Sequence, residues 1–325
     1  MNLIDAYRYL AALEQHRHFG RAAAACHITQ PALSNALRAL EAHFDVAIVR
    51  RGRQYEGLTP EGAQVLATAH RVLREQEALQ QALAGSAEQP RGGLVIGAVP
   101  TAVPIAARFA ARLVERHPGL CPQVRSLSSQ EIEAGLDALA IDLGLGYTDR
   151  LDGARGGALQ AWPQYVEHYH LLRRVAHGGP ALHFGVPLRW ADAAAHPLCL
   201  LAPEMHNRAI LDGVFRDLGL DVQPVIETNS VMALLAAVQA SQLVAVLPGA
   251  LVSTVTGQPG LEALPLVDPD LRTPIGFMSA AAARPSHALA AALRLAAEPA
   301  WIAEAAAHSG PLRAPPPADF DHEGE

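Results

Sequence analysis

Two short helices joined by a tight turn, within residues 19–44, constrain this chain most strongly. Thr29 is suited to cap the second helix, and Pro31 stands in its first turn, where proline is tolerated. The other side of this helix is polar. The segment therefore predicts a small helical core that presents one polar helix face to a partner. Apolar residues recur at helical spacing along the second helix, namely Leu33, Leu37 and Leu40.

The next segment predicts a short strand at Val46–Val49, a basic turn at Arg50–Arg53 and a long helix capped by Thr59. We expect this helix to run to about Gln89, a length of roughly 45 Å. Its apolar residues follow a three-four spacing, and one helix cannot bury such a stripe by itself. Packing against a partner helix is therefore expected. Three leucines are expected in this contact: Leu66, Leu73 and Leu83.

Residues 90–93, Pro-Arg-Gly-Gly, are expected to form a hinge, because the hydrophobic pattern changes beyond them. From residue 94 onward, apolar runs of strand length alternate with helical segments. This alternation is typical of βαβ units, so we expect a mostly parallel sheet with helices on both faces. The tail from residue 308 contains three consecutive prolines and several acidic residues, and it is expected to be disordered.

Several stretches carry a resemblance to a known family. They are Thr29–Ser34 (Thr-Gln-Pro-Ala-Leu-Ser), Ala36–Glu41, Leu58–Gly62 and Gly93–Ala102. Through these stretches the chain resembles a LysR-type transcriptional regulator, and the resemblance covers nearly all of it. The resemblance implies an α+β multi-domain fold. An N-terminal winged helix-turn-helix and a long linker helix would precede a C-terminal α/β effector-binding domain that is similar to a periplasmic binding protein.

The same resemblance implies domain boundaries. The winged helix-turn-helix DNA-binding domain would span 1–60, the linker or dimerisation helix 61–89, the hinge 90–93 and the effector-binding domain 94–307. Subdomain I would comprise 94–163 and 268–307, subdomain II would comprise 164–267, and two crossing strands would join them. Residues 308–325 would form the tail.

A helix presented on a three-helix core fits the major groove of DNA, where its N-terminal residues meet the base edges. Gln30 and Asn35 can pair bidentately with adenine, and Arg38 can reach guanine or a phosphate. The basic turn would contact phosphates or a narrow minor groove. The alternative is a solvated helix face beside an ordinary basic turn, and the linked signature favours DNA reading. The expected DNA-binding residues are Thr29, Gln30, Pro31, Ala32, Ser34, Asn35, Arg38, Arg50, Arg51 and Arg53.

In open α/β sheets, ligands bind at the edge where strands end and helices begin. Helix N-termini carry partial positive charge and free amide donors, so an anion is the favoured ligand there. Each Ser, Thr or Asn at such a place can instead be a simple helix cap. Arg208 adds a formal charge, although it can instead pair with Asp212 one turn along. The expected effector-binding residues are Pro100, Thr101, Ser128, Ser129, Asn207, Arg208, Thr228 and Asn229.

The expected function is that of a ligand-responsive transcription factor. It would bind double-stranded promoter DNA as homodimers that assemble into a homotetramer, and a small anionic effector would modulate this binding. The resemblance extends to regulators of cyanate, nitrate and formate dehydrogenase genes. The alternatives are an effector-independent architectural DNA-binding protein and an enzyme, although the chain has no Gly-x-Ser-x-Gly, P-loop or His-Glu-x-x-His sequence. No cofactor or metal is expected.

The distribution of charge and the cysteine positions indicate the kind of partner and the cellular compartment. The first 93 residues carry ten Arg against nine Asp and Glu, a net of +1, and the rest carry fifteen against twenty-three, a net of −8. A mildly basic head on an acidic body permits nucleic-acid binding by the head. Cys26, Cys121 and Cys199 lie far apart and are expected to be small buried residues in a reducing compartment. Without a membrane-spanning run or a signal-peptide pattern, the chain is expected to be cytoplasmic and to have no membrane partner.

Overall fold

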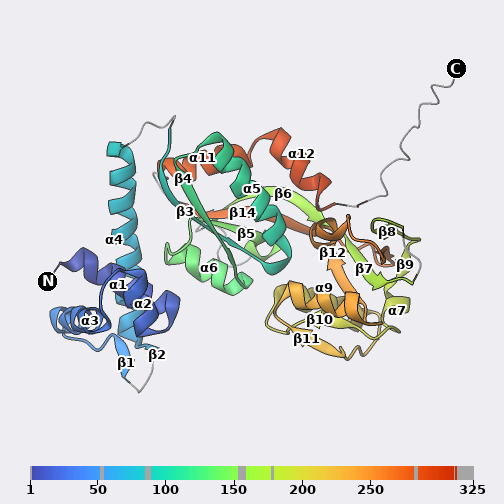
Figure 1. The fold of residues 1–325 in the computed structure, drawn as a ribbon, viewed down its shortest axis with the longest axis horizontal. Coiled ribbons are helices and arrows are strands. Elements are labelled where there is room, and N and C mark those ends of the chain that lie inside the picture. Colours follow the sequence, from blue (N-terminus) through green and yellow to red (C-terminus); the bar gives the residue numbers. More distant parts are fainter. Residues whose placement is uncertain are drawn as a thin grey trace.

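The structure, a computed structural model, describes residues 2–51, 55–84, 89–152, 159–176, 179–281, 285–310 and 312. A small helical head lies at one end of the molecule, a long helix stands beside it, and two α/β units follow (Figure 1). We call residues 2–58 the head and the region after residue 88 the C-terminal unit.

The head consists of three helices and a β-hairpin. They are α1 (Leu3–His16), α2 (Phe19–Ala25), α3 (Gln30–Phe44), β1 (Val49–Arg51) and β2 (Tyr55–Leu58), with β1 and β2 antiparallel. Leu10, Leu33 and Leu40 are fully buried in its core. The strand expected at Val46–Val49 begins only at Val49, so the first part of that apolar run is loop. The two helices expected within residues 19–44 and the burial of the leucines of the second are confirmed.

The long helix α4 (Pro60–Ala84) begins where the sequence predicts. The Thr59 hydroxyl oxygen accepts a hydrogen bond from the Gly62 amide at 2.9 Å. A Cβ at Gly62 would lie 2.1 Å from the Ile48 carbonyl oxygen, so glycine lets the helix approach the hairpin closely. Gln89 is not helical, so the helix is shorter than expected, and residues 85–88 lie outside the described part.

The apolar stripe of α4 divides into two parts. Leu66 and Leu73 pack against the core of the chain's own head. Leu79 and Leu83 are 59% and 80% exposed. Leu66 and Leu73 are thus partly buried by the head, the exposed part of the stripe lies nearer the end of the helix, and the contact with a second chain stays a prediction.

The first sheet of the C-terminal unit has the strand order β4-β3-β5-β14-β6. Strand β3 runs parallel to β4 and β5, whereas β14 runs antiparallel to β5 and β6. Four of its five strands, β3, β4, β5 and β6, therefore point the same way, as expected of a mostly parallel sheet, and β14 alone runs against them, because it returns to the sheet from a distant part of the chain. The strands are β3 (Gly92–Ala98), β4 (Leu120–Ser126), β5 (Leu143–Tyr147), β6 (Leu159–Glu167) and β14 (Thr273–Ala280). Gly92 and Gly93, expected in a hinge, are the first residues of β3.

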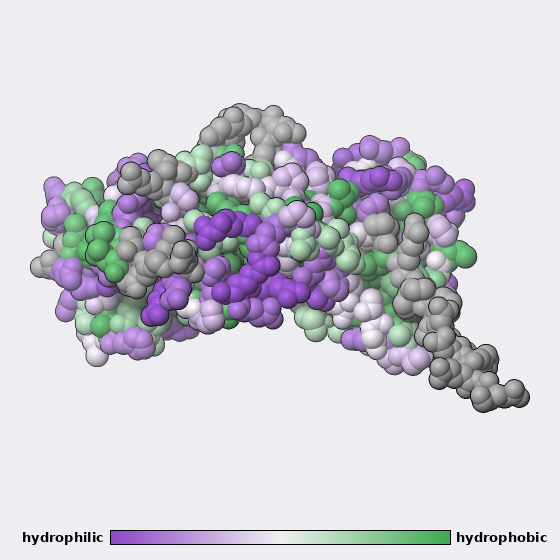
Figure 2. All heavy atoms as spheres, turned by 90° about the horizontal axis from the view of Figure 1, so that it is seen from above, coloured by the Kyte–Doolittle hydropathy of each residue, from purple (hydrophilic) through white to green (hydrophobic). Residues whose placement is uncertain are grey.

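Helices cover both sides of this sheet, with α5, α11 and α12 on one side and α6 on the other (Figure 1). The Phe109 ring packs against Phe277 and Trp301, with ring centroids 4.4 and 5.1 Å away. The outer side of α5 is charged, and hydrophilic side chains gather in the middle of the molecule when it is viewed from above (Figure 2). The helices are η1 (Pro100–Ala102), α5 (Val103–Arg116), α6 (Ser129–Asp137), η2 (Asp149–Asp152), α11 (His287–Ala296) and α12 (Pro299–Ala307).

The second sheet has the order β12-β7-β13-β8, with β9 also paired to β13, and β10 and β11 form a separate parallel pair. Neighbouring residues of β7 enter different cores, Leu172 on one face of the sheet and Leu171 on the other. The strands are β7 (Tyr169–Arg174), β8 (His183–Phe184), β9 (Leu188–Arg189), β10 (Cys199–Leu201), β11 (Ile226–Thr228), β12 (Ala245–Pro248) and β13 (Leu261–Val267). The helices are α7 (Trp190–Ala193), α8 (His206–Asp217), α9 (Val231–Ala240), α10 (Gly249–Val252) and η3 (Ser253–Val255).

The chain passes between the two sheets at two places. Strand β6 belongs to the first sheet up to Glu167, and β7 of the second sheet begins at Tyr169. The return runs from Val267 at the end of β13 to Thr273 at the start of β14. The first crossing thus lies beyond the boundary expected at residue 163, because β6 extends further along β14 than its local sequence suggests.

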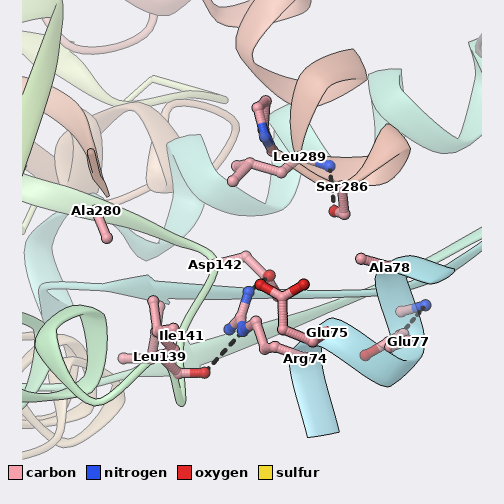
Figure 3. A pocket seen from close by; sticks show the side chains of 12 residues that line it. Arg74, Glu75, Glu77, Ala78, Leu139, Ile141, Asp142, Ala280, Ser286 and Leu289 are labelled. Carbon is pink, nitrogen blue, oxygen red and sulfur yellow. Dashed lines mark hydrogen bonds and ion pairs between the residues drawn. The ribbon is translucent and has the colours of Figure 1, made fainter. Parts of the chain in front are cut away.

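Helix α4 also contacts the C-terminal unit of its own chain. The Arg74 guanidinium donates to the Leu139 carbonyl oxygen at 2.8 Å and forms an ion pair with Asp142. The other Asp142 oxygen accepts from the Val95 amide at 2.7 Å, so this carboxylate joins α4 to strand β3. Figure 3 shows Arg74 pointing from α4 toward Leu139 and Asp142. Burial lowers the pKa of Arg74 to about 10, which still leaves it charged at neutral pH.

The domain division predicts that a fragment beginning at Gln89 folds without the head and α4, because the C-terminal unit has its own cores. We expect this fragment to melt in one cooperative transition followed by circular dichroism. A fragment beginning at Gly97 is the control. It cuts β3, which lies between β4 and β5, and should fail to give a cooperative melt. Similar behaviour of both fragments would contradict the division.

Candidate functional site

The first candidate surface is the polar face of α3. Leu33 and Leu37 turn into the head core, whereas Gln30, Asn35 and Arg38 are exposed on the opposite side. The Arg38 guanidinium donates to the Asn35 side-chain oxygen at 3.1 Å, so these two side chains lie together. The arrangement offers amide and guanidinium groups on one convex helix face, as binding in a DNA groove requires.

The other DNA-binding residues expected from the sequence lie around this face. The Thr29 hydroxyl caps α3 by accepting from the Ala32 amide at 3.4 Å. Pro31 and Ala32 are exposed in the first turn, and Ser34 is half-buried. Arg50 and Arg51 stand in strand β1 and not in a turn, and Arg50 is exposed. The Arg51 side chain and all of Arg53 lie outside the described residues.

The second candidate site is a small pocket between the two α/β units. Its interior is narrow and has room for about one water molecule. The first α/β unit, which contains the sheet β4-β3-β5-β14-β6, contributes the loop after β3, the start of α6 and the end of β5. The second α/β unit, which contains the sheet β12-β7-β13-β8, contributes the end of β10 and the start of α8. The lining residues are Val99, Pro100, Thr101, Ser128, Ser129, Tyr147, Leu201, Met205, His206 and Asn207.

Several polar atoms in this pocket have no hydrogen-bond partner among the described residues. They are Ser129 Oγ, Asn207 Nδ2 and His206 Nε2. Ser129 and Asn207 are only 8% and 5% exposed, so these polar atoms depend on what occupies the pocket. A buried polar group without a partner costs free energy, and a water molecule or a polar ligand in the pocket would recover it.

Ser128 has a different role from Ser129. The Ser128 amide donates to a Glu131 carboxylate oxygen at 2.8 Å, and the Ser128 hydroxyl oxygen accepts from the Glu131 amide at 3.3 Å. This reciprocal pair is a capping box, so the helix-cap alternative holds for Ser128. The hydroxyls of Thr101 and Tyr147 lie 3.2 Å apart in the wall of the pocket.

A buried carboxyl group, that of Glu167, lies behind the part of the pocket wall that Thr101 and Tyr147 form. Glu167, the last residue of β6, is 0% exposed, and Tyr169 donates to one of its oxygens at 3.3 Å. Burial raises the pKa of Glu167 to about 8, and the nearby hydroxyls of Thr101, Tyr169 and Tyr147 oppose this rise. At neutral pH the carboxyl is therefore mostly uncharged.

Three residues expected in the effector site lie elsewhere. Arg208 donates to the Leu201 carbonyl oxygen at 3.0 Å and pairs with Asp212 at 2.7 Å and Glu227 at 2.6 Å. A guanidinium that is removed from water needs such partners, and the ion-pair alternative with Asp212 is the one observed. The Thr228 hydroxyl accepts from the Ser230 amide, and Asn229 is exposed. None of the three lines the pocket.

Sequence reasoning missed five residues that line the pocket, and it also missed Glu167 behind the pocket wall. The five are Val99, Tyr147, Leu201, Met205 and His206. Tyr147 ends a strand and His206 begins a helix, so the rule that placed Thr101 could have found both. Nothing in the local pattern around Glu167 indicates burial, because its strand leaves one sheet immediately before the next begins.

The cysteines only partly follow expectation. Cys199 is fully buried and Cys26 is half-buried, but Cys121 is exposed on β4, which corrects the expectation that all three are buried. Burial raises the pKa of the Cys199 thiol to about 11. Within the described residues, His, Cys, Asp and Glu form no group suited to hold a metal ion. No helix in the described part is long and apolar enough to cross a membrane.

Comparisons with known proteins cover both parts of the chain. Residues 87–316 match the family model of the LysR substrate binding domain. Residues 4–63 match that of the bacterial regulatory helix-turn-helix protein, lysR family. An SDS degradation transcriptional activation protein from Pseudomonas sp. is 30% identical over 260 residues, 76% of this chain and 79% of that protein.

Other similar proteins include regulators whose names refer to hydrogen peroxide. A probable hydrogen peroxide-inducible genes activator from Mycobacterium xenopi is 34% identical over 171 residues, 52% of this chain and 88% of that protein. The DNA-binding transcriptional dual regulator OxyR of Escherichia coli K12 is 40% identical over 101 residues, 31% of this chain and 33% of that protein.

Solved structures share the fold. Full-length OxyR from Pseudomonas aeruginosa superposes with a TM-score of 0.64 at 21% identity, covering 93% of this chain and 96% of that one. Full-length CbnR complexed with its target DNA gives 0.62 at 20% identity, covering 93% and 99%. The expected order of a winged helix-turn-helix, a linker helix and a two-part α/β domain is confirmed.

The contacts of Arg208 predict a role in stability. Arg208→Gln should lower the free energy of unfolding by about 1–3 kcal/mol, because it removes charge-assisted bonds to partners that are themselves partly exposed. Arg216→Gln, an exposed arginine of the same helix, is the control and should change stability by less than about 0.5 kcal/mol. Chemical denaturation measures both. Equal stability of the two variants would contradict a structural role for Arg208.

Proposed function

Because this chain belongs to the LysR family of DNA-binding transcriptional regulators, we propose that a small anionic metabolite seated between its two α/β units controls its binding to promoter DNA. Members of this family are regulators and not enzymes. The observation that carries the proposal is the pocket whose buried Ser129 and Asn207 side chains have polar atoms without partners.

DNA reading is assigned to the exposed face of α3. Gln30 and Asn35 carry the amide groups that suit adenine, and Arg38 carries the guanidinium that suits guanine or phosphate. The exposed Arg50 in the hairpin is suited to phosphate contact at the edge of the same surface. The acidic charge of the remaining chain disfavours DNA contact there.

An anion is the effector class that the pocket favours. The first turn of α6 forms part of its wall, and a helix N-terminus offers free amides and partial positive charge. The same ligand can accept hydrogen bonds from the hydroxyl groups of Thr101, Ser129 and Tyr147 and from the side-chain amide of Asn207. The charge of Arg208 takes no part in this proposal, because carboxylates already pair with it.

The names of the relatives raise hydrogen peroxide as an alternative signal. A thiol that senses peroxide reacts as the thiolate. Burial raises the pKa of both Cys26 and Cys199, which disfavours the thiolate at those positions, and Cys121 lies on the outside of the unit. We therefore favour a non-covalent effector. The relatives named above are not described as regulators of cyanate, nitrate or formate metabolism, so that narrower expectation gains no support from them.

We assign dimerisation to the exposed end of α4, where Leu79 and Leu83 need a partner surface. Two such helices would place two heads on one partly palindromic site, and pairs of dimers would form the homotetramer. Such a regulator would act in the cytoplasm, where the promoter is. An architectural protein without an effector remains the alternative, and a DNA footprint that no small molecule changes would favour it.

Gln30→Ala and Arg38→Ala should each weaken specific DNA binding by roughly 1–3 kcal/mol, because each removes one bidentate base contact. Binding sites selected from the genome of the source organism, measured by footprinting at fixed salt, provide the test. Gln239→Ala, an exposed glutamine of α9, is the control and should bind normally. Unchanged affinity for both α3 variants would contradict the assignment of this face.

Ser129→Ala should weaken binding of small anions by roughly 2- to 10-fold without loss of stability, since its hydroxyl has no partner to lose. Ser128→Ala is the matched control, because loss of the helix cap should cost about 1 kcal/mol of stability. Nitrate, formate and acetate are the probes, titrated into the full-length protein by calorimetry. Equal affinity of the wild type and Ser129→Ala for every probe that binds would remove Ser129 from the site.

A further inference from the structure

Glu167 is a fully buried carboxyl at the place where the chain passes from one α/β unit to the other. It ends β6, and Tyr169 begins β7. One of its oxygens, Oε1, has no hydrogen-bond partner among the described residues. Buried carboxyl groups with a raised pKa are often found at functional sites, so the residues around Glu167 indicate what its carboxyl could do.

The groups that face Glu167 come from several elements. Tyr147 belongs to β5, Tyr165 to β6 and Tyr169 to β7, and all three rings are buried. The Tyr169 hydroxyl also lies 2.8 Å from the Thr273 hydroxyl of β14. Asp149 acts on Tyr147 as a further negative charge. No arginine or histidine of the described part of the chain appreciably lowers the pKa of Glu167.

Two of these neighbours also line the effector pocket. The Thr101 and Tyr147 hydroxyls lie 3.2 Å apart in the pocket wall, and both oppose the rise of the Glu167 pKa, so they lie near its carboxyl. Each hydroxyl has one hydrogen to donate, and one of the two hydrogens joins the pair. The charge of Glu167 therefore decides whether the other hydrogen points toward the carboxyl or into the pocket.

We propose that Glu167 is the specificity-determining residue of the pocket, and that it admits an anion only while its carboxyl is uncharged. This inference rests on the function proposed above and adds its regulation by protons. When the carboxyl is neutral, the Thr101–Tyr147 pair donates its remaining hydrogen into the pocket. When the carboxyl is ionised, it accepts that hydrogen and repels the anion from behind the wall.

Anion binding is then linked to the proton on Glu167. Burial raises the pKa of this carboxyl to about 8. With that value, the apparent affinity for an anion should fall about tenfold between pH 7 and pH 9, since the competent fraction falls by that factor. Nitrate is the sharpest probe, because its own charge is constant over this range.

The first measurement needs no ligand. A buried carboxyl with a raised pKa holds its proton in the folded state and releases it on unfolding, so its contribution to stability is lost as pH rises from the unfolded value toward 8. The melting temperature of the wild type should therefore fall across this window. Glu167→Gln keeps the shape without the charge, and its melting temperature should fall less. Glu204→Gln, an exposed glutamate, is the control and should follow the wild type.

The second measurement titrates nitrate, with formate and acetate in parallel, into the full-length wild type and Glu167→Gln at pH 7 and pH 9. We expect about a tenfold loss of affinity for the wild type and an equal affinity at both pH values for the variant. If the wild type and Glu167→Gln show the same pH dependence of nitrate affinity, or the same pH dependence of melting temperature, the role proposed for Glu167 is overturned. The proposed anion site would still stand. Binding of no probe to either protein would overturn the anion assignment on which the role depends.

Discussion

The two passages of the chain between its α/β units determine the geometry of the C-terminal half. Because β6 continues into β7 and β13 returns into β14, the second unit is inserted between two strands of the first. The ends of strands from both units therefore face one another, and the polar groups placed there by Thr101, Ser129 and Asn207 enclose a common pocket. The same passages bury Glu167, so the chemistry of the pocket depends on how the units are joined.

Much of the fold could be predicted from local sequence. The spacing of Leu33, Leu37 and Leu40 located the helix of the head, and the alternation of apolar runs beyond residue 94 indicated βαβ units. The direction of β14 could not be predicted in this way, because helices cover both faces of its sheet and the strand is buried along most of its length, as a parallel strand would be. The end of α4 was also misplaced, since Gln89, expected in the helix, is not helical.

The candidate sites were predictable to different degrees. Residues at helix starts after strands were selected by rule, and the structure brings Thr101, Ser129 and Asn207 together in one pocket. The same rule selected Arg208, which pairs with Asp212 and Glu227 in the folded chain, because a sequence does not show which carboxylates will lie within reach of a cation. Leu66 and Leu73 have the spacing of a contact between chains, and in this structure they also pack against the head of the same chain.

Helix α6 has one further property. Its first turn belongs to the pocket, and just beyond its last turn the Leu139 carbonyl receives the Arg74 guanidinium of α4. Nine residues of helix measure about 13 Å, and a helix this short bends little. A rigid displacement of its pocket end would therefore also move the Leu139 end. Arg74 contacts both Leu139 and Asp142, so α4, the helix next to the head, is attached directly to the segment that such a displacement would move.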